Sequence, residues 1–420
     1  MKTLIKILSP FLALSILLAS CTASANMAAS DQKRILDPDI PTGDLKTLVD
    51  GNNAFALDMY QALRSEDGNL ILSPYSISLA LAMTFAGARG ETESQMANVL
   101  HFSQPQVQLH PAFNALDLTL EKSPGNFEKD QQPMTLNIAN AVWTEQTLTI
   151  QKDFLDTIAL NYGAGVHLAD FINKYEPARR EINNWVSDKT NKKIQDLLPE
   201  GSVDTDTRMA LVNAIYFKAD WRSQFNAAST GDAPFFLLDG SQVTVKMMHL
   251  TMSFPYRKGD GYQAVELEYA GETAAMDIIM PDEGTFETFE SSFRKETYDL
   301  IISSMEYATV DLGFPKFTFT KDLNLNNVLT EMGMPDAFNR DLADFSGIIT
   351  EKRLYIENVF HKAFVAVDEK GTEAAAATAV LVAPSSLPEY LNIDHPFIFV
   401  IRDTVHGQIL FIGRVLNPAE

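Results

Sequence analysis

The spacing of apolar residues changes along the chain, from helical periods in the first half to strand-like runs in the second. Apolar positions that recur every three to four residues predict amphipathic helices, and short alternating or continuous apolar runs predict strands. The helical periods cover Leu45–Arg64, Pro74–Ala88, Glu91–Leu100, Gln151–Tyr162 and Glu176–Thr190. The strand-like runs cover Thr135–Thr144, Met209–Lys218, Ala264–Leu267, Ala275–Met280, Thr309–Thr320, Leu354–Val367, Phe397–Ile401 and Ile409–Val415. This order predicts an α+β fold with large, mostly antiparallel sheets.

The first residues carry the pattern of an export signal. Lys2 and Lys6 flank an apolar run from Ile7 to Ala19. As a helix this run reaches about 20 Å, which is shorter than the roughly 30 Å hydrocarbon core of a membrane. The pattern therefore indicates a signal peptide over residues 1–20, and a membrane-spanning helix is the alternative.

The end of this segment, Leu18-Ala19-Ser20-Cys21, resembles the bacterial lipoprotein box, in which the cysteine is acylated and becomes the first mature residue. The resemblance implies a protein that is lipid-anchored to the cell envelope through Cys21. Thr22 stands where an aspartate would redirect sorting, which implies the outer membrane. A plain signal peptide cleaved after Ala23 or Ala25, with a periplasmic or secreted product, is the alternative.

The rest of the chain divides into a short tether and one long continuous body. Residues 21–43 are rich in Ala, Ser, Asp and Pro and lack sustained periodicity, so we expect a flexible tether. A length of 420 residues fits two or three domains. From Asp44 onward, however, no linker, repeat or low-complexity stretch marks a domain boundary.

The composition is that of a globular protein with a strong negative charge. A hydrophobic content of 46% with 10% aromatic residues excludes a disordered or fibrous chain. With 33 Lys and Arg against 55 Asp and Glu, the net charge of −22 disfavours nucleic acid as a partner. Cys21 is the only cysteine. The exported body therefore lacks disulfides and thiolate metal sites, and its stability depends on the size of its core.

Common catalytic motifs are missing from the sequence. The 7 histidines include no His-Glu-x-x-His arrangement and no pair at ligand spacing, so no metal site is predicted. Ser346-Gly347 lacks the flanking glycine of a nucleophile elbow. A Ser-His-Asp triad stays open, because its members need not be neighbours in the sequence.

An alanine-rich segment between Asp368 and Pro388 has two structural interpretations. As a helix, it has Thr372 as its N-cap and Pro384 beyond its end. As a strand, it has small side chains on both faces and is charged only near its start, which suits entry between two other strands. On one face of that strand lie Thr372, Ala374, Ala376, Thr378, Val380 and Val382. Composition alone does not decide between the two.

Several blocks of distinctive sequence follow one another in one consistent order between Asp44 and Pro418. They are Asn69–Met96, Leu211–Lys218 with Trp221, Asp336–Ile348, His361–Phe364 followed by Glu369–Thr378, and His395–Arg402 followed by Phe411–Val415. Together these blocks resemble the serpins, the serine protease inhibitor superfamily. A serpin is one domain of about nine helices and three β-sheets with an exposed reactive-centre loop. The resemblance therefore implies a single domain over residues 44–420.

The resemblance implies a suicide-substrate inhibitor of serine proteases rather than an enzyme. A protease that attacks the loop forms an acyl-enzyme, and the severed loop then inserts as a strand into the main sheet. The implied hinge lacks the proline, bulk or inward charge that non-inhibitory serpins usually carry. Its residues are Glu369, Gly371, Thr372, Glu373, Ala374, Ala375, Ala376, Ala377 and Thr378.

The family register places the bait residue fourteen positions after Gly371, at Ser385, and the reactive bond at Ser385–Ser386. The preceding bait residues are Val382, Ala383 and Pro384. A small, uncharged bait suits the shallow pockets of elastase-like or subtilisin-like proteases better than a trypsin-like pocket with a buried aspartate. Val382 is the second choice for the bait residue.

Further residues match two structural regions of the family. The shutter, a hydrogen-bonded cluster beneath the opening sheet, is matched by Ser73, Ser76, Asn213 and His361. The breach, where the loop first enters, is matched by Trp221 and Glu369, with Lys316 as the expected ionic partner of Glu369. Ordinary buried polar groups and a weak surface ion pair are the respective alternatives.

We expect a monomer whose partner is a target serine protease and which takes no cofactor. The region His101–Glu121 contains no Lys or Arg, so a heparin-type cofactor is not predicted. The alternative functions are a non-inhibitory serpin that acts as a carrier or chaperone, and a serine hydrolase. The non-inhibitory alternative predicts no large thermal stabilisation after loop cleavage.

Overall fold

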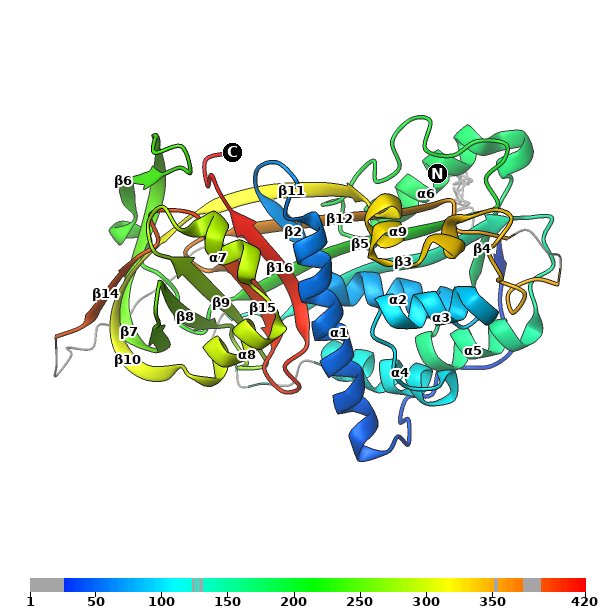
Figure 1. The fold of residues 1–420 in the computed structure, drawn as a ribbon, viewed down its shortest axis with the longest axis horizontal. Coiled ribbons are helices and arrows are strands. Elements are labelled where there is room, and N and C mark those ends of the chain that lie inside the picture. The colour runs from blue at the N-terminus through cyan, green and yellow to red at the C-terminus, as the bar shows by residue number, and fades with distance from the viewer. Residues whose placement is uncertain (1–25, 123–124, 126, 128–130, 351–353, 373–386) are drawn as a thin grey trace, which may run out of the picture.

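The computed structural model describes residues 26–122, 125, 127, 131–350, 354–372 and 387–420. A large sheet with helices on both faces continues into a strand-rich half (Figure 1). Within these residues the helices are α1 Thr42–Leu63, α2 Pro74–Phe85, α3 Gly90–Val99, α4 Gln106–Lys122, α5 Lys152–Tyr162, α6 Phe171–Lys189, α7 Phe286–Ser292, α8 Lys295–Ser303 and α9 Asn326–Met332, with 3-10 turns η1 Ala227–Ser229 and η2 Pro335–Phe338. The predicted α+β class is confirmed.

The strands of the main sheet include a parallel pair near its centre. In order across the sheet they are β1 Met27–Ala28, β4 Val166–Ala169, β3 Thr135–Glu145, β5 Met209–Asp220, β13 Gly371–Thr372, β12 Asn358–Val367 and β11 Phe317–Asn324. β5 is antiparallel to β3, and β12 is antiparallel to β11. β5 and β12 run parallel over seven register pairs, from Asn358↔Ala210 to Phe364↔Tyr216. We call this junction the seam.

The other strands form one continuous sheet in the strand-rich half. Its order is β14 Glu389–Asn392, β10 Glu306–Pro315, β7 Gln242–Lys258, β8 Tyr262–Glu268, β9 Ala274–Pro281, β15 Phe397–Asp403, β16 Ile409–Val415 and β2 Leu70–Leu72, and β6 Gly231–Phe236 pairs with β7. We expected three sheets, and the hydrogen bonding among the described residues joins their strands into two. The long strand β7 is the reason, because it pairs with β6 and β10 along most of its length and with β8 at its end.

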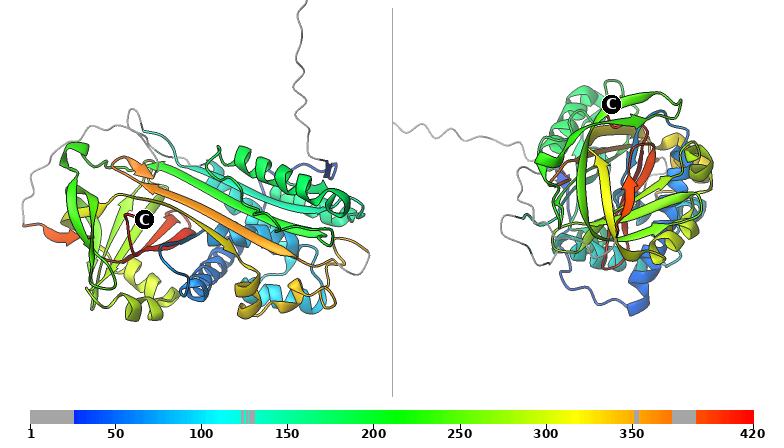
Figure 2. Two further views of the ribbon diagram at one scale, coloured as in Figure 1. Left: turned by 90° about the horizontal axis from the view of Figure 1, so that it is seen from above. Right: turned by 90° about the vertical axis from the view of Figure 1, so that its left-hand side faces the viewer.

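Helices cover the two faces of the main sheet unequally. Of the helices in the described ranges, α6 covers one face, where Ile182 and Val186 pack with Trp143, Val212 and Phe360 of the sheet (Figure 2). The opposite face rests on the larger core that includes α1 and α2 (Figure 1). All of α2 is buried. A strand that enters the seam would therefore lie between the buried helix α2 and its neighbours on one side and α6 on the other.

Helix α2 begins directly beneath the seam. Ser73 is its N-cap, and its hydroxyl accepts a hydrogen bond from the Ser76 backbone N–H at 3.3 Å. Pro74 occupies the first helical position, where a missing N–H costs nothing. The same Ser73 hydroxyl donates to the Leu410 carbonyl in β16 at 2.7 Å. This start therefore ties the helix to the C-terminal hairpin.

Residues 26–41, within the stretch predicted as a flexible tether, lie against the domain. β1 pairs with β4 at the sheet edge, through Met27↔His167 and Ala28↔Val166. Arg34 donates to Asn114 at 2.8 Å and forms ion pairs with Asp117 at 2.5 Å and Glu121 at 3.1 Å. The expectation of a flexible tether rested on low periodicity, and neither a single strand pairing nor one partly buried arginine produces a periodic pattern in the sequence. None of the helices in the described ranges is long and apolar enough to cross a bilayer.

The Arg34 contacts predict a measurable contribution to stability. Arg34→Ala removes a largely buried guanidinium and leaves the Asp117 carboxylate without its main partner, so we expect a loss of about 2 kcal/mol in the free energy of unfolding. Lys46→Ala, which removes an exposed ion pair with Asp50 within α1, is the control and should change stability by less than about 0.5 kcal/mol. Denaturant titration followed by circular dichroism measures both. Equal midpoints for the two variants would contradict the packed arrangement.

Candidate functional site

The alanine-rich segment starts as a strand inside one end of the seam. Gly371 and Thr372 pair with Asp220 and Ala219 of β5, and Thr372 also pairs with Val367 of β12. This short strand, β13, is antiparallel to both neighbours. A side chain at Gly371 would collide with the Ala219 carbonyl, so the close approach of the two backbones requires glycine. The strand interpretation holds for these two residues, and Glu373–Pro384 lie outside the described residues.

The side chain of Thr372 is buried within the seam. Only 1% of the residue is exposed, and its hydroxyl shares a 2.8 Å hydrogen bond with the hydroxyl of Tyr269. Tyr269 stacks on Trp221 with ring centroids 4.6 Å apart and an interplanar angle of 10°. The first inward-facing hinge residue therefore occupies a closed, partly aromatic site that leaves little room for a larger side chain.

Trp221 holds the turn that leads into β13. Its indole N–H donates to the Asp368 carbonyl at 3.0 Å, and its backbone N–H donates to the Lys370 carbonyl at 2.5 Å. The Phe225 N–H donates to the Glu369 carbonyl at 2.7 Å. Three successive carbonyls of the turn are therefore bound by the segment after β5, which fixes the direction in which the chain enters the sheet.

Glu369 is paired as the sequence led us to expect. Its carboxylate lies 2.7 Å from the Lys316 ammonium and accepts a hydrogen bond from the Thr230 hydroxyl at 2.9 Å. Partial burial acts to raise the pKa of the Glu369 carboxyl, but these hydrogen bonds outweigh burial and lower it. The pair is partly exposed, so its main effect is to hold the turn in place rather than to add much stability.

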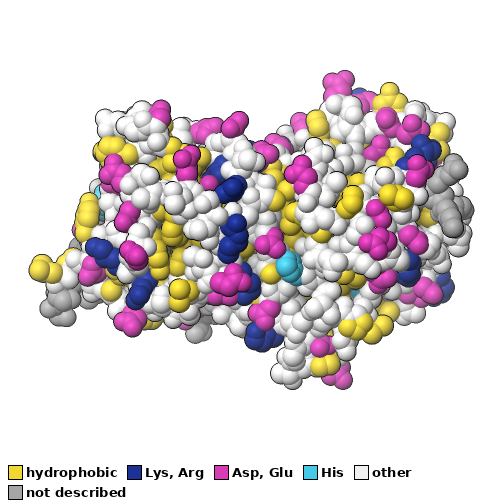
Figure 3. Space-filling model, in the orientation of Figure 1, with side chains coloured by type: hydrophobic (Ala, Val, Ile, Leu, Met, Phe, Trp, Pro, Cys, Tyr) yellow, Lys and Arg dark blue, Asp and Glu magenta, His cyan; other side chains and the backbone are white. Residues whose placement is uncertain are grey.

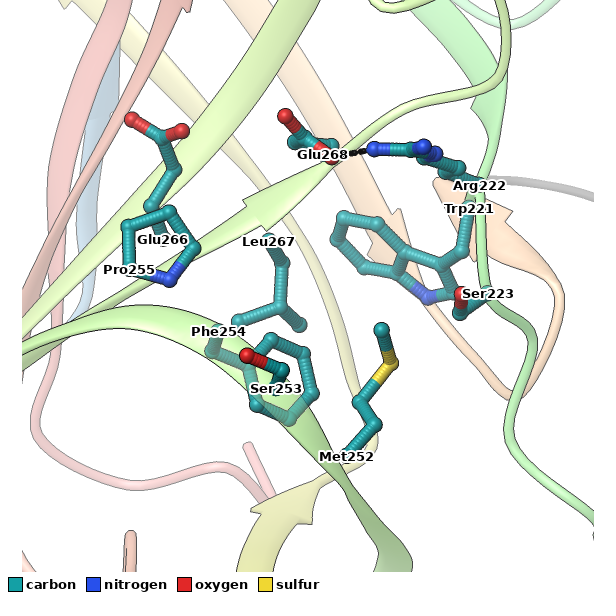
Figure 4. Close-up of a pocket in the computed structure, with 10 residues that line it drawn as sticks. All are labelled: Trp221, Arg222, Ser223, Met252, Ser253, Phe254, Pro255, Glu266, Leu267 and Glu268. Atoms are coloured by element: carbon teal, nitrogen blue, oxygen red, sulfur yellow. Dashed lines mark hydrogen bonds and ion pairs between the residues drawn. The ribbon is translucent and has the colours of Figure 1, made fainter. Parts of the chain in front are cut away.

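A small cavity adjoins Trp221 on the strand-rich side (Figure 4). Arg222 forms an ion pair with Glu268 at its rim, and Met252 and Leu267 line its wall. Its volume of about 20 Å³ admits a single water molecule. The cavity is therefore too small to serve as a ligand site.

The four predicted shutter residues lie together beneath the seam. The Nε2 atom of the His361 imidazole accepts a hydrogen bond from the Ser73 backbone N–H at 3.1 Å. Its other ring nitrogen, Nδ1, donates a hydrogen bond to the Asn213 side-chain carbonyl. The Asn213 side-chain amide donates to the Ser76 hydroxyl at 2.7 Å. Asn213 and His361 are register partners in β5 and β12. The cluster therefore connects the two strands of the seam to each other and to the start of α2.

Asn140 of β3 completes this cluster. Its side-chain carbonyl accepts from Asn213 at 2.5 Å and from Ser76 at 3.1 Å, and its amide donates to the Ser76 carbonyl at 2.9 Å. Sequence reasoning missed Asn140, although an asparagine in the middle of the predicted strand Thr135–Thr144 was a signal. It also missed Tyr269 and Thr230 at the breach, which carry no comparable signal.

The other predicted site residues are not placed by the structure. The reactive bond Ser385–Ser386, the bait residues Val382–Pro384, the hinge from Glu373 to Thr378 and the lipidation site Cys21 lie outside the described residues. Thr372 is the last described residue before residues 373–386, and Leu387 is the first described residue after them.

A mixed α+β domain whose main sheet holds a short strand, Gly371–Thr372, between two strands that otherwise pair in parallel is a distinctive class of fold. Residues 50–418 match the family described as Serpin (serine protease inhibitor). The chain belongs to the serpin family.

Relatives and solved structures agree with this assignment. An uncharacterized serpin-like protein of Thermococcus kodakarensis is 39% identical over 90% of this chain and 87% of its own length. The leukocyte elastase inhibitor of Equus caballus is 38% identical over 89% of this chain and 100% of its own length. The crystal structure of the thermophilic serpin Tengpin in the native state has a TM-score of 0.81 at 29% identity and covers 94% of this chain and 99% of that chain.

The buried imidazole of His361 predicts a pH dependence of stability. Burial lowers the pKa of His361 to about 3, below the ordinary value of 6.5. Between these values the unfolded state binds the proton and the native state does not. The stability that this group contributes is therefore complete above pH 6.5 and falls by up to about 1.4 kcal/mol per pH unit as the pH drops toward 3.

Two measurements test this dependence. In the wild-type protein the imidazole resonances of His361 should not titrate between pH 7 and 5 by nuclear magnetic resonance. In His361→Gln, the free energy of unfolding should fall less steeply over that range than in the wild type. The difference in slope should approach the contribution of one proton, about 1.4 kcal/mol per pH unit. A His361 resonance that titrates near pH 6.5 in the folded protein would show that the imidazole is not held neutral by burial.

Proposed function

We propose that this serpin is an irreversible suicide-substrate inhibitor of serine proteases with elastase-like or subtilisin-like specificity. The observation that carries the proposal is the entry of Gly371 and Thr372 between β5 and β12, antiparallel to both. The match to the family of serine protease inhibitors and the similarity to leukocyte elastase inhibitors support it. The protein acts as a substrate that stalls its protease, and no catalytic residue of its own is required.

The register of β13 indicates how a longer strand would lie. Six residues on from Thr372 is Thr378, and six residues back from Ala219 and Val367 are Asn213 and His361. A continued strand would thus place Thr378 between these two shutter residues. The register with β5 and the register with β12 both place Thr378 at the Asn213–His361 pair. One strand can therefore fill the seam without a shift in register.

Filling the seam would release free energy. Fourteen inserted residues would form a strand of roughly 46 Å. Each new ladder hydrogen bond contributes about 1 kcal/mol net, so insertion would yield on the order of 10–20 kcal/mol. A protease still bound through its acyl ester would be dragged along the sheet. Loss of a single oxyanion-hole hydrogen bond slows such an enzyme by about 10²–10³, which is sufficient to leave the ester intact for long periods.

The proposed bait residues are the reason for proposing elastase-like or subtilisin-like proteases as targets. A reactive bond at Ser385–Ser386 after Val382, Ala383 and Pro384 offers small, uncharged side chains, which fit shallow pockets. Val382 remains the second choice for the bait. We also propose an exported protein, held at the cell envelope by a lipid on Cys21, that protects the envelope from such proteases.

Incubation with an elastase tests the inhibitor proposal against the non-inhibitory alternative. The wild-type protein should form a complex that survives denaturing electrophoresis. Thr372→Arg should be cleaved with little or no complex, because an arginine cannot occupy the buried site beside Tyr269. Thr47→Arg on the exposed side of α1 is the matched control and should behave like the wild type.

Two outcomes would count against the proposal. Wild-type protein that is cleaved in the loop without forming a complex, and without a rise in thermal stability, would favour the carrier or chaperone alternative. Complex formation by Thr372→Arg at the wild-type yield would refute the assignment of Thr372 to the hinge.

A further inference from the structure

The chain just after the proposed reactive bond exposes two large apolar side chains. Leu387 is 97% exposed, and Tyr390 is 68% exposed. Among the described residues Leu387 is the most exposed of the large hydrophobic side chains. A single exposed leucine is common on protein surfaces. Its position, immediately downstream of a bond that a protease is proposed to attack, makes this leucine a candidate for recognition.

The segment that carries these side chains is firmly attached to the strand-rich half. β14 pairs in parallel with β10 through four register pairs, from Val310↔Glu389 to Gly313↔Asn392. Leu391 and Ile393 are fully buried, and the Ile393 N–H donates to the Gly313 carbonyl at 2.8 Å. The alternation places Tyr390 outward and Leu391 inward. The backbone on which Tyr390 stands is therefore held before any partner arrives, and Leu387 lies two residues before the start of this strand.

Two further features bear on this attachment. The side chain of Asn392 in β14 lies directly over Gly313 of β10, where a larger residue would displace it. Pro388 restricts the backbone between Leu387 and β14. A binding segment that is ordered in advance loses less conformational entropy on association, and so more of its contact energy appears as affinity.

The distance along the chain brings both side chains within reach of a docked protease. Leu387 is the second residue after the Ser385–Ser386 bond, and Tyr390 is the fifth. An extended chain spans at most about 3.5 Å per residue, so Tyr390 lies within roughly 18 Å of that bond. Tyrosine is enriched among the residues that contribute most of the binding energy at protein interfaces.

We propose that Leu387 is a specificity-determining residue that enters an apolar pocket on the leaving-group side of the target protease, with Tyr390 packing on the adjacent protease surface. This inference rests on the proposed function and specifies its partner. The target is then a serine protease with a shallow pocket for the bait residue and an apolar pocket for the second residue after the bond. Specificity is shared between the two sides of the bond.

The chemistry of acylation limits when these contacts act. The protease serine oxygen bonds to the carbonyl carbon of Ser385, the bond from that carbon to the Ser386 nitrogen breaks, and the serine proton passes to the new amine of Ser386. Leu387 then belongs to the leaving group and stays with β14, while the protease remains bound to the upstream segment. Contacts to Leu387 therefore assist docking and acylation and are lost before trapping.

This order of events predicts a selective kinetic effect. Leu387→Ser should lower the second-order rate constant of complex formation with an elastase by about tenfold, since the buried area of one leucine is lost. The stoichiometry of inhibition and the lifetime of the complex should not change. Leu387→Met should retain most of the rate, because methionine also fills an apolar pocket.

A matched control and a mass measurement complete the test. Leu342→Ser changes another exposed leucine, 58% exposed and distant in sequence from the loop, and should leave the rate unchanged. The released C-terminal fragment should begin at Ser386 by intact mass. Absence of any complex with wild-type protein would overturn the proposed function itself. Normal complex formation with an unchanged rate in Leu387→Ser, or a fragment that begins at Ala383, would overturn only the role of Leu387.

Discussion

The parallel pairing of β5 with β12 is the constraint on which the rest of this structure depends. Each strand has an antiparallel neighbour on its other side, β3 and β11 respectively. Parallel ladders are slightly less stable per residue than antiparallel ones. A strand antiparallel to both β5 and β12 would therefore satisfy the same backbone groups and add a second ladder. The short strand β13 already has this orientation at one end of the seam.

Polar contacts control the seam at its end and near its middle. At the breach, Trp221 binds the carbonyls of the entering turn and Glu369 pairs with Lys316. Further along, the Asn213–His361 pair bridges β5 and β12 while the same side chains hold Ser73 and Ser76 of the underlying helix. Opening the seam breaks this buried network before any new strand can compensate. Such a barrier is what a natively folded but kinetically held state requires.

The acidic charge of the molecule is compatible with this account but does not determine it. Acidic side chains are spread over the face seen in Figure 3, in keeping with the net charge of −22. The shutter contacts at the seam are buried hydrogen bonds between serine, asparagine and histidine side chains rather than ion pairs.

Much of this arrangement could be predicted from the sequence, and the failures have physical causes. The shutter residues and the Lys316–Glu369 pair followed from motif resemblance. The run Thr309–Thr320 was predicted as one strand, but β10 ends at Pro315 and β11 starts at Phe317, so the chain changes sheets around Lys316.

Two further failures concern the helix α4 and the alanine-rich segment. Helix α4 was missed because Pro111 interrupts its pattern. Local propensity could not separate helix from strand after Gly371, because the outcome depends on β5 and β12, which are distant in sequence.

A reversible lock across the seam tests the central claim most directly. Ala214 of β5 and Lys362 of β12 are register partners on the face beneath α6, and Cys21 is the only native cysteine. In a Cys21→Ser background, Ala214→Cys with Lys362→Cys places two thiols on adjacent strands at a spacing suited to a disulfide. The oxidised protein should be cleaved by an elastase without forming a stable complex, and reduction should restore the complex. A stable complex formed with the lock intact would contradict insertion at this seam.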